Sequence, residues 1–395
     1  MWVPESVVNA LRAGGHEVTV ITGVPHYPSG DVVPGYRAGN PQDETIDGIK
    51  VLRVPEYPYR GTGVLGRLAC YASFAASSTI RTLLIARRFD AVFVYASPAT
   101  SALPAMALKL LARVPFILQV QDVWPDSVVD SGFVKKSSLL NAISALLGIF
   151  VSLSYKLSSK VLVISPSAKR LLESRGVPEE KLETLFNWIE DPLTIDKLNS
   201  AEGHSLRSQV EAGSATRLFF YAGAMGPAQD LPSIISAFSA AGVEDRARLV
   251  LVGSGVALNE IRDLSSQVEG VHVLKAVPLV TARRWTMESD VGIVSLADTE
   301  LHQSTFPSKI QLLTGMGIPL LIRAPGDTST LVEQTGSGVG VSSFDLASLT
   351  NAFQKMTDMP QDELHNMGRS ARLWYEQSFN PMRATASLNR ILSRL

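Results

Sequence analysis

The chain of 395 residues is longer than one hydrophobic core usually supports, so we expect two domains. With 46% hydrophobic and 18% charged residues its composition is that of a globular protein, and its net charge of -1 argues against a general nucleic-acid binder. Cys70 is the only cysteine, which excludes an intramolecular disulfide and a cysteine-based zinc site and indicates a reducing compartment.

Basic residues are concentrated in the first half of the chain. Between Lys50 and Arg175 there are 16 lysines and arginines but 6 acidic residues, so this segment carries +10 and the remainder -11. A basic half beside an acidic half suggests that one half approaches an anionic surface. No basic segment followed by an apolar run precedes Arg12, so we expect no secretory signal and a cytoplasmic location.

Apolar strands alternate with helices through the first half, which predicts a parallel, doubly wound sheet. The expected strands are residues 17–22, 49–54, 91–95, 115–120 and 160–164, and the expected helices are residues 4–12, 66–88 and 100–113. Such a sheet normally begins with a central strand and a glycine-rich turn. Here a helix comes first, so we expect an upstream in-frame segment of about 20 residues that supplies this strand.

Asp122 directly follows an expected strand, at the end where ligands bind in doubly wound sheets. In that position its carboxylate accepts a proton or hydrogen-bonds a sugar. The alternative is that Asp122 closes an Asx turn before Pro125, and the spacing alone leaves both interpretations open.

The segment 137–155 is uncharged, is flanked by lysines and is close to the lower length limit for a membrane span. Small polar residues recur along it at intervals of three or four, so they line one helix face. This pattern favours a helix lying in the membrane interface, with a buried core helix and a membrane-spanning helix as alternatives. In the interfacial arrangement Ile143, Leu147 and Phe150 face the lipid.

The second half repeats the alternation of strands and helices. Its expected strands are residues 217–222, 249–253, 291–296 and 320–322, with a further segment at 271–278 and a helix at 231–240. A glycine-rich turn over 223–230 follows the first of these strands. Glycine allows the backbone to approach a ligand closely, although a plain strand–helix turn has the same composition.

A lysine is expected at the start of the helix that follows strand 291–296. Pro307 suits the first helical position, because its missing N–H would have no partner there. Ser308 and Lys309 then lie in the first turn, where free amide groups and the helix dipole favour an anion. The pattern predicts a phosphate-bearing ligand at the carboxyl edge of a parallel sheet, and the alternative is a solvated lysine.

Several segments together resemble family 4 retaining glycosyltransferases of the GT-B fold, and most of all the N-acetylfucosamine transferase-like branch that builds bacterial surface polysaccharides. The similar segments are residues 15–28, 47–51, 55–60, 121–126, 186–192, 223–230, 271–278, 307–310 and 317–321. The resemblance covers nearly the whole chain. It implies an α/β fold of two Rossmann-like doubly wound domains facing a cleft, with the first strand of the N-terminal domain missing.

The resemblance also implies domain roles. Residues 1–190 would form the acceptor-binding domain and residues 205–375 the nucleotide-sugar-binding domain, and a helix over 376–395 would pack back toward the N-terminal domain. Asp122 and Lys309 would be catalytic. The implied donor-binding residues are Gly223, Gly226, Gln229, Gly253, Val277, His302, Pro307, Ser308, Lys309 and Gln311, and the implied acceptor-binding residues are His26, Tyr27 and Trp124. No metal site and no cofactor are expected, because helix dipoles and cations stabilise the leaving diphosphate.

The implied reaction is transfer of a sugar, an N-acetylated amino sugar or deoxy sugar, from a nucleotide diphosphate, with UDP favoured. The acceptor would be a lipid-linked saccharide or glycan at the inner membrane face, in O-antigen, capsule or exopolysaccharide synthesis. The enzyme would be a metal-independent hexosyltransferase.

Three departures from the family pattern keep other functions open. Leu312 stands where the wider family has a ribose-binding glutamate, so Gln311 or His302 would have to hold the ribose. Gln229 stands where many members have a lysine, and the first strand is not in the chain. Leu312 and the missing strand favour a non-catalytic partner subunit as the alternative, and a GT-B sugar-nucleotide epimerase is a third possibility.

Overall fold

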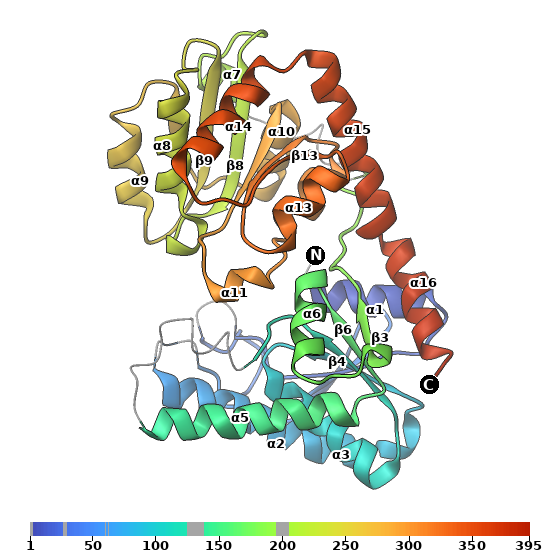
Figure 1. Cartoon of the computed structure of the whole chain (residues 1–395). Coiled ribbons are helices and arrows are strands. Elements are labelled where there is room, and N and C mark those ends of the chain that lie inside the picture. Colours follow the sequence, from blue (N-terminus) through green and yellow to red (C-terminus); the bar gives the residue numbers. More distant parts are fainter. Residues whose placement is uncertain (1–2, 27–29, 60, 62, 125–137, 195–204) are drawn as a thin grey trace. The chain divides into compact units, whose positions relative to one another are not determined.

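The computed structural model describes residues 3–26, 30–59, 61, 63–124, 138–194 and 205–395. The chain forms two compact units. The N-terminal unit comprises residues 2–186 together with 384–395, and the C-terminal unit comprises residues 187–383. Each unit is an α/β structure in which helices cover the strands (Figure 1).

The C-terminal unit is built on a six-stranded parallel sheet with the strand order β10-β9-β8-β11-β12-β13. Its strands are β8 (Arg217–Ala224), β9 (Ala247–Ser254), β10 (Val271–Lys275), β11 (Val291–Ser295), β12 (Leu320–Arg323) and β13 (Gly338–Val341). Its helices are α7 (Leu206–Gln209), α8 (Leu231–Ala241), α9 (Leu258–Ser265), α10 (Leu279–Glu288), α11 (Glu300–Gln303), α12 (Lys309–Gly315), α13 (Asp327–Gln334), α14 (Leu346–Asp358) and α15 (Gln361–Ser378), with a 3₁₀ turn at Pro227–Gln229. Strands β8, β9, β11 and β12 are mostly buried, as the sequence predicted for a sheet covered on both faces, whereas the edge strand β10 is half-buried and ends at the exposed Lys275.

The core of this unit locks its central strand. Phe219 of β8 meets Phe238 of α8 and Phe353 of α14 edge-on, and all three rings are fully buried. Burying each ring contributes about 1.5–3 kcal/mol. On the other face, Gly292 of β11 lies where a Cβ atom would be 2.5 Å from Leu313, so glycine lets α12 pack directly on the sheet. This packing fixes the start of α12, where the candidate lysine lies.

The N-terminal unit contains two separate sheets. One has the order β1-β3-β2, from strands β1 (Thr19–Thr22), β2 (Gln42–Ile46) and β3 (Ile49–Arg53), and the other is parallel with the order β4-β5-β6-β7, from β4 (Val92–Ala96), β5 (Phe116–Val120), β6 (Lys160–Val163) and β7 (Leu182–Thr184). Among the described residues no strand joins β1 to β4, which is where the sequence pattern lacked a central strand. The sequence did not predict β2, which is polar and antiparallel to β3, or β7, which has three residues.

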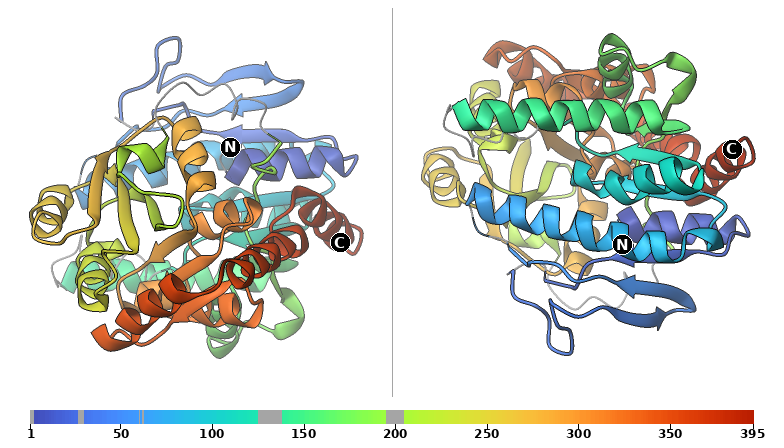
Figure 2. Two further views of the ribbon diagram at one scale, coloured as in Figure 1. Left: turned by 90° about the horizontal axis from the view of Figure 1, so that it is seen from above. Right: turned by 90° about the horizontal axis from the view of Figure 1, so that it is seen from below.

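Helices cover both sheets of the N-terminal unit. They are α1 (Val3–Ala13), α2 (Val64–Leu84), α3 (Leu103–Ala112), α5 (Ser138–Leu157) and α6 (Pro166–Ser174), with 3₁₀ turns at Ala86–Arg88, Ala99–Ala102 and Glu179–Lys181. Helices α2, α3 and α5 lie side by side in one layer (Figure 2). The end of α16 (Pro381–Leu392) completes the unit, where Asn389 bonds Gly14 and Arg390 pairs with Glu183.

Helix α5 is turned differently from the prediction. Leu147 and Phe150, expected to face lipid, pack against the core, whereas Leu146 and Ile149 are each 67% exposed. The side chain of Ile143 lies outside the described residues. Val151, Ser154 and Tyr155 face inward, toward the sheet. These contacts set the orientation of the helix, and the stripe of small residues in the sequence does not reveal them. In the described part of the chain no helix is both long and apolar enough to cross a membrane.

Candidate functional site

Lys309 lies at the start of α12, but the helix begins slightly later than predicted. Lys309 is the first helical residue and Ser308 is the N-cap, so Pro307 precedes the helix instead of opening it. The amide of Ile310 donates to the Pro307 carbonyl at 3.1 Å, a bond spanning three residues, so the chain enters α12 through a tight turn. The side chains of Pro307 and Ser308 therefore lie beside Lys309 on one corner of the unit.

The Lys309 ammonium group stacks on an aromatic ring and, in the described residues, has no acidic partner. Its Nζ lies 3.4 Å from the centroid of the Tyr221 ring, a cation–π contact. Burial lowers the pKa of Lys309 to about 7. Burying a lysine without an anionic partner destabilises the folded protein. A bound anion would compensate the buried charge, so this lysine is a candidate ligand-binding group.

Gly223 makes room for this lysine at the end of β8. A Cβ atom at Gly223 would lie 2.6 Å from Lys309 Cε and 2.7 Å from Nζ, and its φ of +150° also favours glycine. Gly253, its partner in β9, likewise lies where a Cβ atom would overlap the Gly223 carbonyl. The two glycines thus allow strand ends and lysine to converge.

The side chain of Gln229 holds the turn that follows β8. The Gly226 amide donates to Gln229 Oε1 at 3.1 Å, and the Met225 amide donates to the Ser254 carbonyl at 2.9 Å. Asp230 then pairs with the buried Arg323 at the end of β12, with 2.7 Å between nitrogen and oxygen. Gln229 therefore shapes the turn, and Arg323 is paired with Asp230, so among the described residues of this corner Lys309 is the cation without an acidic partner.

Three further predicted donor residues lie on α11, on α12 and after β10. His302 is buried on α11, with Nδ1 2.8 Å from the Ala297 carbonyl. Gln311 is 1% exposed, and its amide lies between the backbone carbonyls of Asn187 and Ser308, so its nitrogen has a partner in either amide orientation. This burial argues against the ribose contact expected of Gln311. Val277, in the connection between β10 and α10, packs against a buried cluster that includes Trp285.

In the N-terminal unit Asp122 and Trp124 follow β5. Ser97, which follows β4, donates to Asp122 at 3.4 Å. Asp122 is exposed, yet the protein packed against one side of its carboxylate raises its pKa, and the Ser97 bond opposes this effect. The Trp124 ring meets Tyr71 of α2 edge-on, with 6.3 Å between centroids. The sequence did not single out Ser97.

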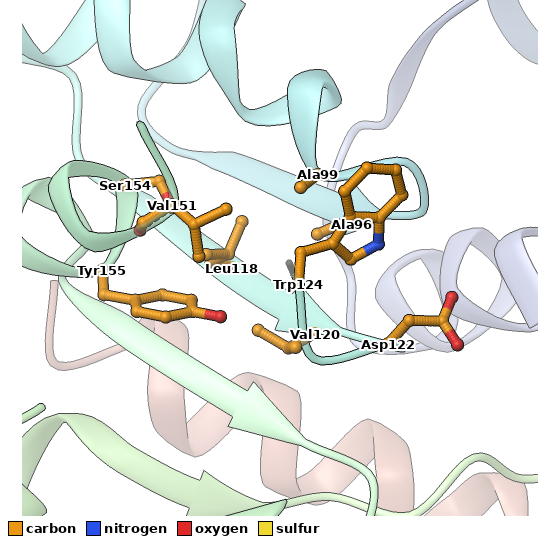
Figure 3. A pocket seen from close by; sticks show the side chains of 9 residues that line it. All are labelled: Ala96, Ala99, Leu118, Val120, Asp122, Trp124, Val151, Ser154 and Tyr155. Carbon is orange, nitrogen blue, oxygen red and sulfur yellow. Dashed lines mark hydrogen bonds between the residues drawn. The ribbon is translucent and has the colours of Figure 1, made fainter. Parts of the chain in front are cut away.

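A small hollow lies behind Asp122 (Figure 3). It is lined by Ala96, Ala99, Leu118, Val120, Asp122, Trp124, Val151, Ser154 and Tyr155. The Asp122 carboxylate points away from the apolar side chains that line the hollow (Figure 3). A volume of about 10 Å³ is close to what one water molecule needs, so a sugar does not enter this hollow. The carboxylate therefore has to meet a ligand on its outer side.

His26 and Glu56 form a second polar pair, after β1 and β3. Nδ1 of His26 lies 3.0 Å from the Val24 carbonyl and 3.2 Å from Glu56 Oε1. Both neighbours accept hydrogen bonds, so Nδ1 carries the proton and, in the neutral ring, Nε2 offers a lone pair. Burial raises the pKa of Glu56 against the opposing effect of His26. Tyr27 lies outside the described residues.

Helix α2 lies next to both the His26–Glu56 pair and the Asp122–Trp124 segment. Cys70 lies close enough to Glu56 for that carboxylate to add to the burial that raises the thiol pKa. The next residue, Tyr71, contacts Trp124. The described residues hold no group of three side chains suited to binding a metal ion. The sequence predicted His26 and Trp124, but the partners Glu56 and Tyr71 emerge only from the fold.

Comparisons with known proteins agree with this architecture. Residues 3–188 match the family described as a glycosyl transferase 4-like domain. The chain is 27% identical over 281 residues to WcaI of Escherichia coli K12, named for colanic acid biosynthesis, an alignment that spans 69% of this chain and 66% of WcaI. Slightly less than two thirds of WcaI is therefore covered. A Pseudomonas aeruginosa protein named as a glycosyltransferase, WbjE, is 21% identical over 291 residues, which are 72% of this chain and 70% of WbjE.

Solved structures resemble the chain over most of its length. Anabaena HepE, in complex with UDP and glucose, superposes with a TM-score of 0.61 at 17% identity, over 88% of this chain and 87% of HepE. Sucrose-phosphate synthase of Thermosynechococcus elongatus superposes with a TM-score of 0.70 at 14% identity, over 99% of this chain and 92% of the synthase. WaaG, a glycosyltransferase involved in lipopolysaccharide biosynthesis, superposes with a TM-score of 0.61 at 12% identity, over 99% of this chain and 95% of WaaG.

The fold is that of GT-B glycosyltransferases, as the sequence predicted. Within this class the curated relatives are WcaI and WbjE, both named as glycosyltransferases. The N-acetylfucosamine transferase-like branch stays a prediction.

Proposed function

We propose that the chain is a retaining glycosyltransferase of surface-polysaccharide synthesis. It moves an N-acetylated amino sugar or deoxy sugar from a nucleotide diphosphate, with UDP favoured, to a lipid-linked or glycan acceptor. Its C-terminal unit binds the donor and its N-terminal unit the acceptor. It works as a peripheral protein at the inner face of the cell membrane.

One observation carries this proposal. Lys309 is a half-buried cation without an acidic partner in the described residues, and it sits against Tyr221 and Gly223 at the carboxyl end of β8. A diphosphate is the ligand that such a cation at the end of a parallel strand suits best. HepE has been solved with UDP, which supports the same donor class.

The acceptor side rests on the N-terminal unit. His26 offers Nε2, Asp122 offers a carboxylate, and Trp124 offers the face of an indole ring, all after parallel strands of the unit. Hydroxyl groups and the apolar face of a sugar ring suit these groups. We assign His26, Tyr27 and Trp124 to the acceptor, and Asp122 with Lys309 to catalysis.

Calorimetric titration with UDP tests the donor assignment. We expect Lys309→Ala to weaken UDP binding by tenfold or more, because a hydrogen bond to a charged group contributes about 1.5–3 kcal/mol. Lys275→Ala is the matched control, an exposed lysine in the same unit. Equal affinities for the two variants would refute the role of Lys309. Full turnover in excess EDTA is expected of a metal-independent enzyme, and its loss would contradict that part.

A non-catalytic partner subunit is the second candidate, because Leu312 offers no carboxylate to a ribose hydroxyl beside the start of α12. Such a subunit would not hydrolyse or transfer sugar from any nucleotide sugar. Slow hydrolysis of a nucleotide sugar by the isolated chain, abolished in Lys309→Ala, would exclude this candidate.

A further inference from the structure

Three neighbouring helices of the N-terminal unit expose an apolar surface. Helices α2, α3 and α5 lie side by side in the right-hand view of Figure 2, and α3 contacts each of the other two. Every exposed residue described in α2 and α3 is Leu, Ile or Ala, and in α5 the exceptions are Ser152 and Lys156. We call this surface the three-helix face. Its largest exposed side chains include Ile80, Leu84, Leu110, Leu111, Leu146 and Ile149.

The polarity of α2 is inverted relative to an ordinary surface helix. Ser78 and Thr82 are 1% and 3% exposed and donate their hydroxyl hydrogens to backbone carbonyls one turn earlier. Ile80 and Leu84, on the opposite side, are 63% and 75% exposed. A helix that buries hydroxyls and exposes aliphatic side chains is suited to an apolar surrounding on its outer side.

Helix α15 of the C-terminal unit shows that the pattern is local. Of its nine exposed residues Leu373 alone is apolar, and the others are charged, amide or histidine side chains. The same chain therefore builds an ordinary polar surface on one unit and an aliphatic one on the other. Composition of the whole protein does not explain the difference.

Charge accompanies the apolar surface. The sequences of α2, α3 and α5 contain no Asp or Glu. Exposed cations stand at or just beyond their C-terminal ends, namely Arg87 and Arg88 after α2, Arg113 after α3 and Lys156 in α5. A cationic border beside an aliphatic surface complements a bilayer with anionic headgroups, and each such cation near the surface contributes about 1 kcal/mol.

We propose that the three-helix face docks on an anionic lipid bilayer, with the leucine and isoleucine side chains among the upper acyl chains. A protein partner fits less well, because protein interfaces are enriched in aromatic side chains and arginine at their centre, whereas this face is aliphatic at its centre. The inference rests on the proposed function for its purpose, since an acceptor carried on a lipid lies at such a bilayer.

Vesicle co-sedimentation of the full chain tests the proposal. The wild type should bind vesicles of equal parts phosphatidylglycerol and phosphatidylcholine, and bind phosphatidylcholine alone more weakly. The combined variant Ile80→Gln, Leu84→Gln, Leu111→Gln, Leu146→Gln and Ile149→Gln should bind the mixed vesicles at least about tenfold more weakly, since it removes five exposed apolar side chains. Glutamine is a good helix former, so the helices should persist.

The matched control is Val256→Gln with Leu373→Gln, which removes exposed apolar side chains from the C-terminal unit and should leave vesicle binding unchanged. If the five-residue variant does not fold, hydrogen exchange of the wild type decides: vesicles should protect peptides from α2, α3 and α5 and not those from α15. Wild-type protein that ignores anionic vesicles, or vesicle binding that survives the five substitutions, overturns the proposal. So does a wild-type dimer that the five substitutions convert to a monomer.

UDP titration separates this proposal from the proposed function. The five-residue variant should keep wild-type UDP affinity in solution. If the wild type binds vesicles but not UDP, the donor assignment fails and the docking surface stands.

Discussion

Lys309 is the residue whose proposed chemistry can be tested most directly. Burial holds its pKa at about 7 in the ligand-free protein, against about 10.4 for a free lysine. An unfolded chain therefore binds more protons than the folded one between about pH 7 and 10, so this group penalises the folded state fully below pH 7, and the penalty declines as pH rises toward 10. Removal of the charge should relieve that penalty.

The first prediction concerns pH. A diphosphate should raise the Lys309 pKa, so UDP binding at pH 8 should take up close to one proton, and affinity should fall by up to tenfold per pH unit above 7. Calorimetry in buffers of different ionisation enthalpy measures the uptake. The variant Lys309→Met should show no uptake, and should melt at a higher temperature than the wild type at pH 6. A lower melting temperature would contradict the buried, unpaired lysine.

The second prediction tests whether the His26–Glu56 pair serves the acceptor and not the donor. Glu56→Gln should lower kcat/KM for the acceptor by tenfold or more, because it removes a carboxylate that holds His26 at 3.2 Å, and it should leave UDP affinity unchanged. Steady-state kinetics with varied acceptor, together with UDP titration, measures both. A matching loss of UDP affinity would mean that Glu56 acts through the fold and not through His26.

At the scale of elements, the glycine at the end of β8 should not tolerate a methyl group, whereas a glycine that precedes β8 should tolerate one. Gly223→Ala places a Cβ atom 2.6 Å from Lys309 Cε and should displace the lysine, with a tenfold or greater loss of UDP affinity. Gly213→Ala is the control, since its nearest neighbour would be Thr216 Oγ1 at 3.8 Å and no donor role is assigned to Gly213. Similar affinities for the two variants would show that lysine position does not govern binding.

Helix α15 holds the segment that opens the C-terminal unit. Arg372 donates to both Asp191 carboxylate oxygens, at 2.9 and 2.5 Å, and to the Gly315 carbonyl at 2.6 Å, while the Tyr375 hydroxyl donates to Ile189 at 2.9 Å. The hydrogen bonds from Arg372 hold the pKa of Asp191 below its ordinary value. The stability that this pair contributes is present above pH 4 and is lost as pH falls through the lowered pKa.

The fourth prediction follows from this ion pair. Arg372→Ala should lower the free energy of unfolding by about 1.5–3 kcal/mol at pH 7, because Asp191 and the Gly315 carbonyl lose their donor. The difference from the wild type should shrink below pH 4, as urea titrations at several pH values would show. A difference independent of pH would mean that the packing of the Arg372 side chain or its bond to the Gly315 carbonyl, and not the ion pair, matters.

At the scale of the whole molecule, we propose separate roles for the two units. The fifth prediction is that UDP at about 100 times its Kd stabilises its site by about 2.7 kcal/mol and slows hydrogen exchange in β8, β11 and α12, with smaller effects in β4 and β5. Mass spectrometry of exchanged peptides resolves the units. Protection concentrated in the N-terminal unit would contradict the proposed division of labour.

The amino-acid sequence by itself determined the fold class, because buried parallel strands leave apolar runs and their connecting helices leave a different period. It also singled out Lys309, Gly223 and Asp122, since a residue at a strand end is placed by the strand before it. It missed β2, whose polar sequence becomes a strand only through pairing with β3.

The tertiary structure decided which side of each helix faces solvent and which residues meet. The inward face of α5 depends on α3 and β5, so Leu147 and Phe150 turned inward and Leu146 and Ile149 outward. Glu56 beside His26, and Tyr221 beneath Lys309, are contacts between residues 30 and 88 positions apart. No local pattern encodes such contacts, because their free energy arises only when the chain has closed the loops between them.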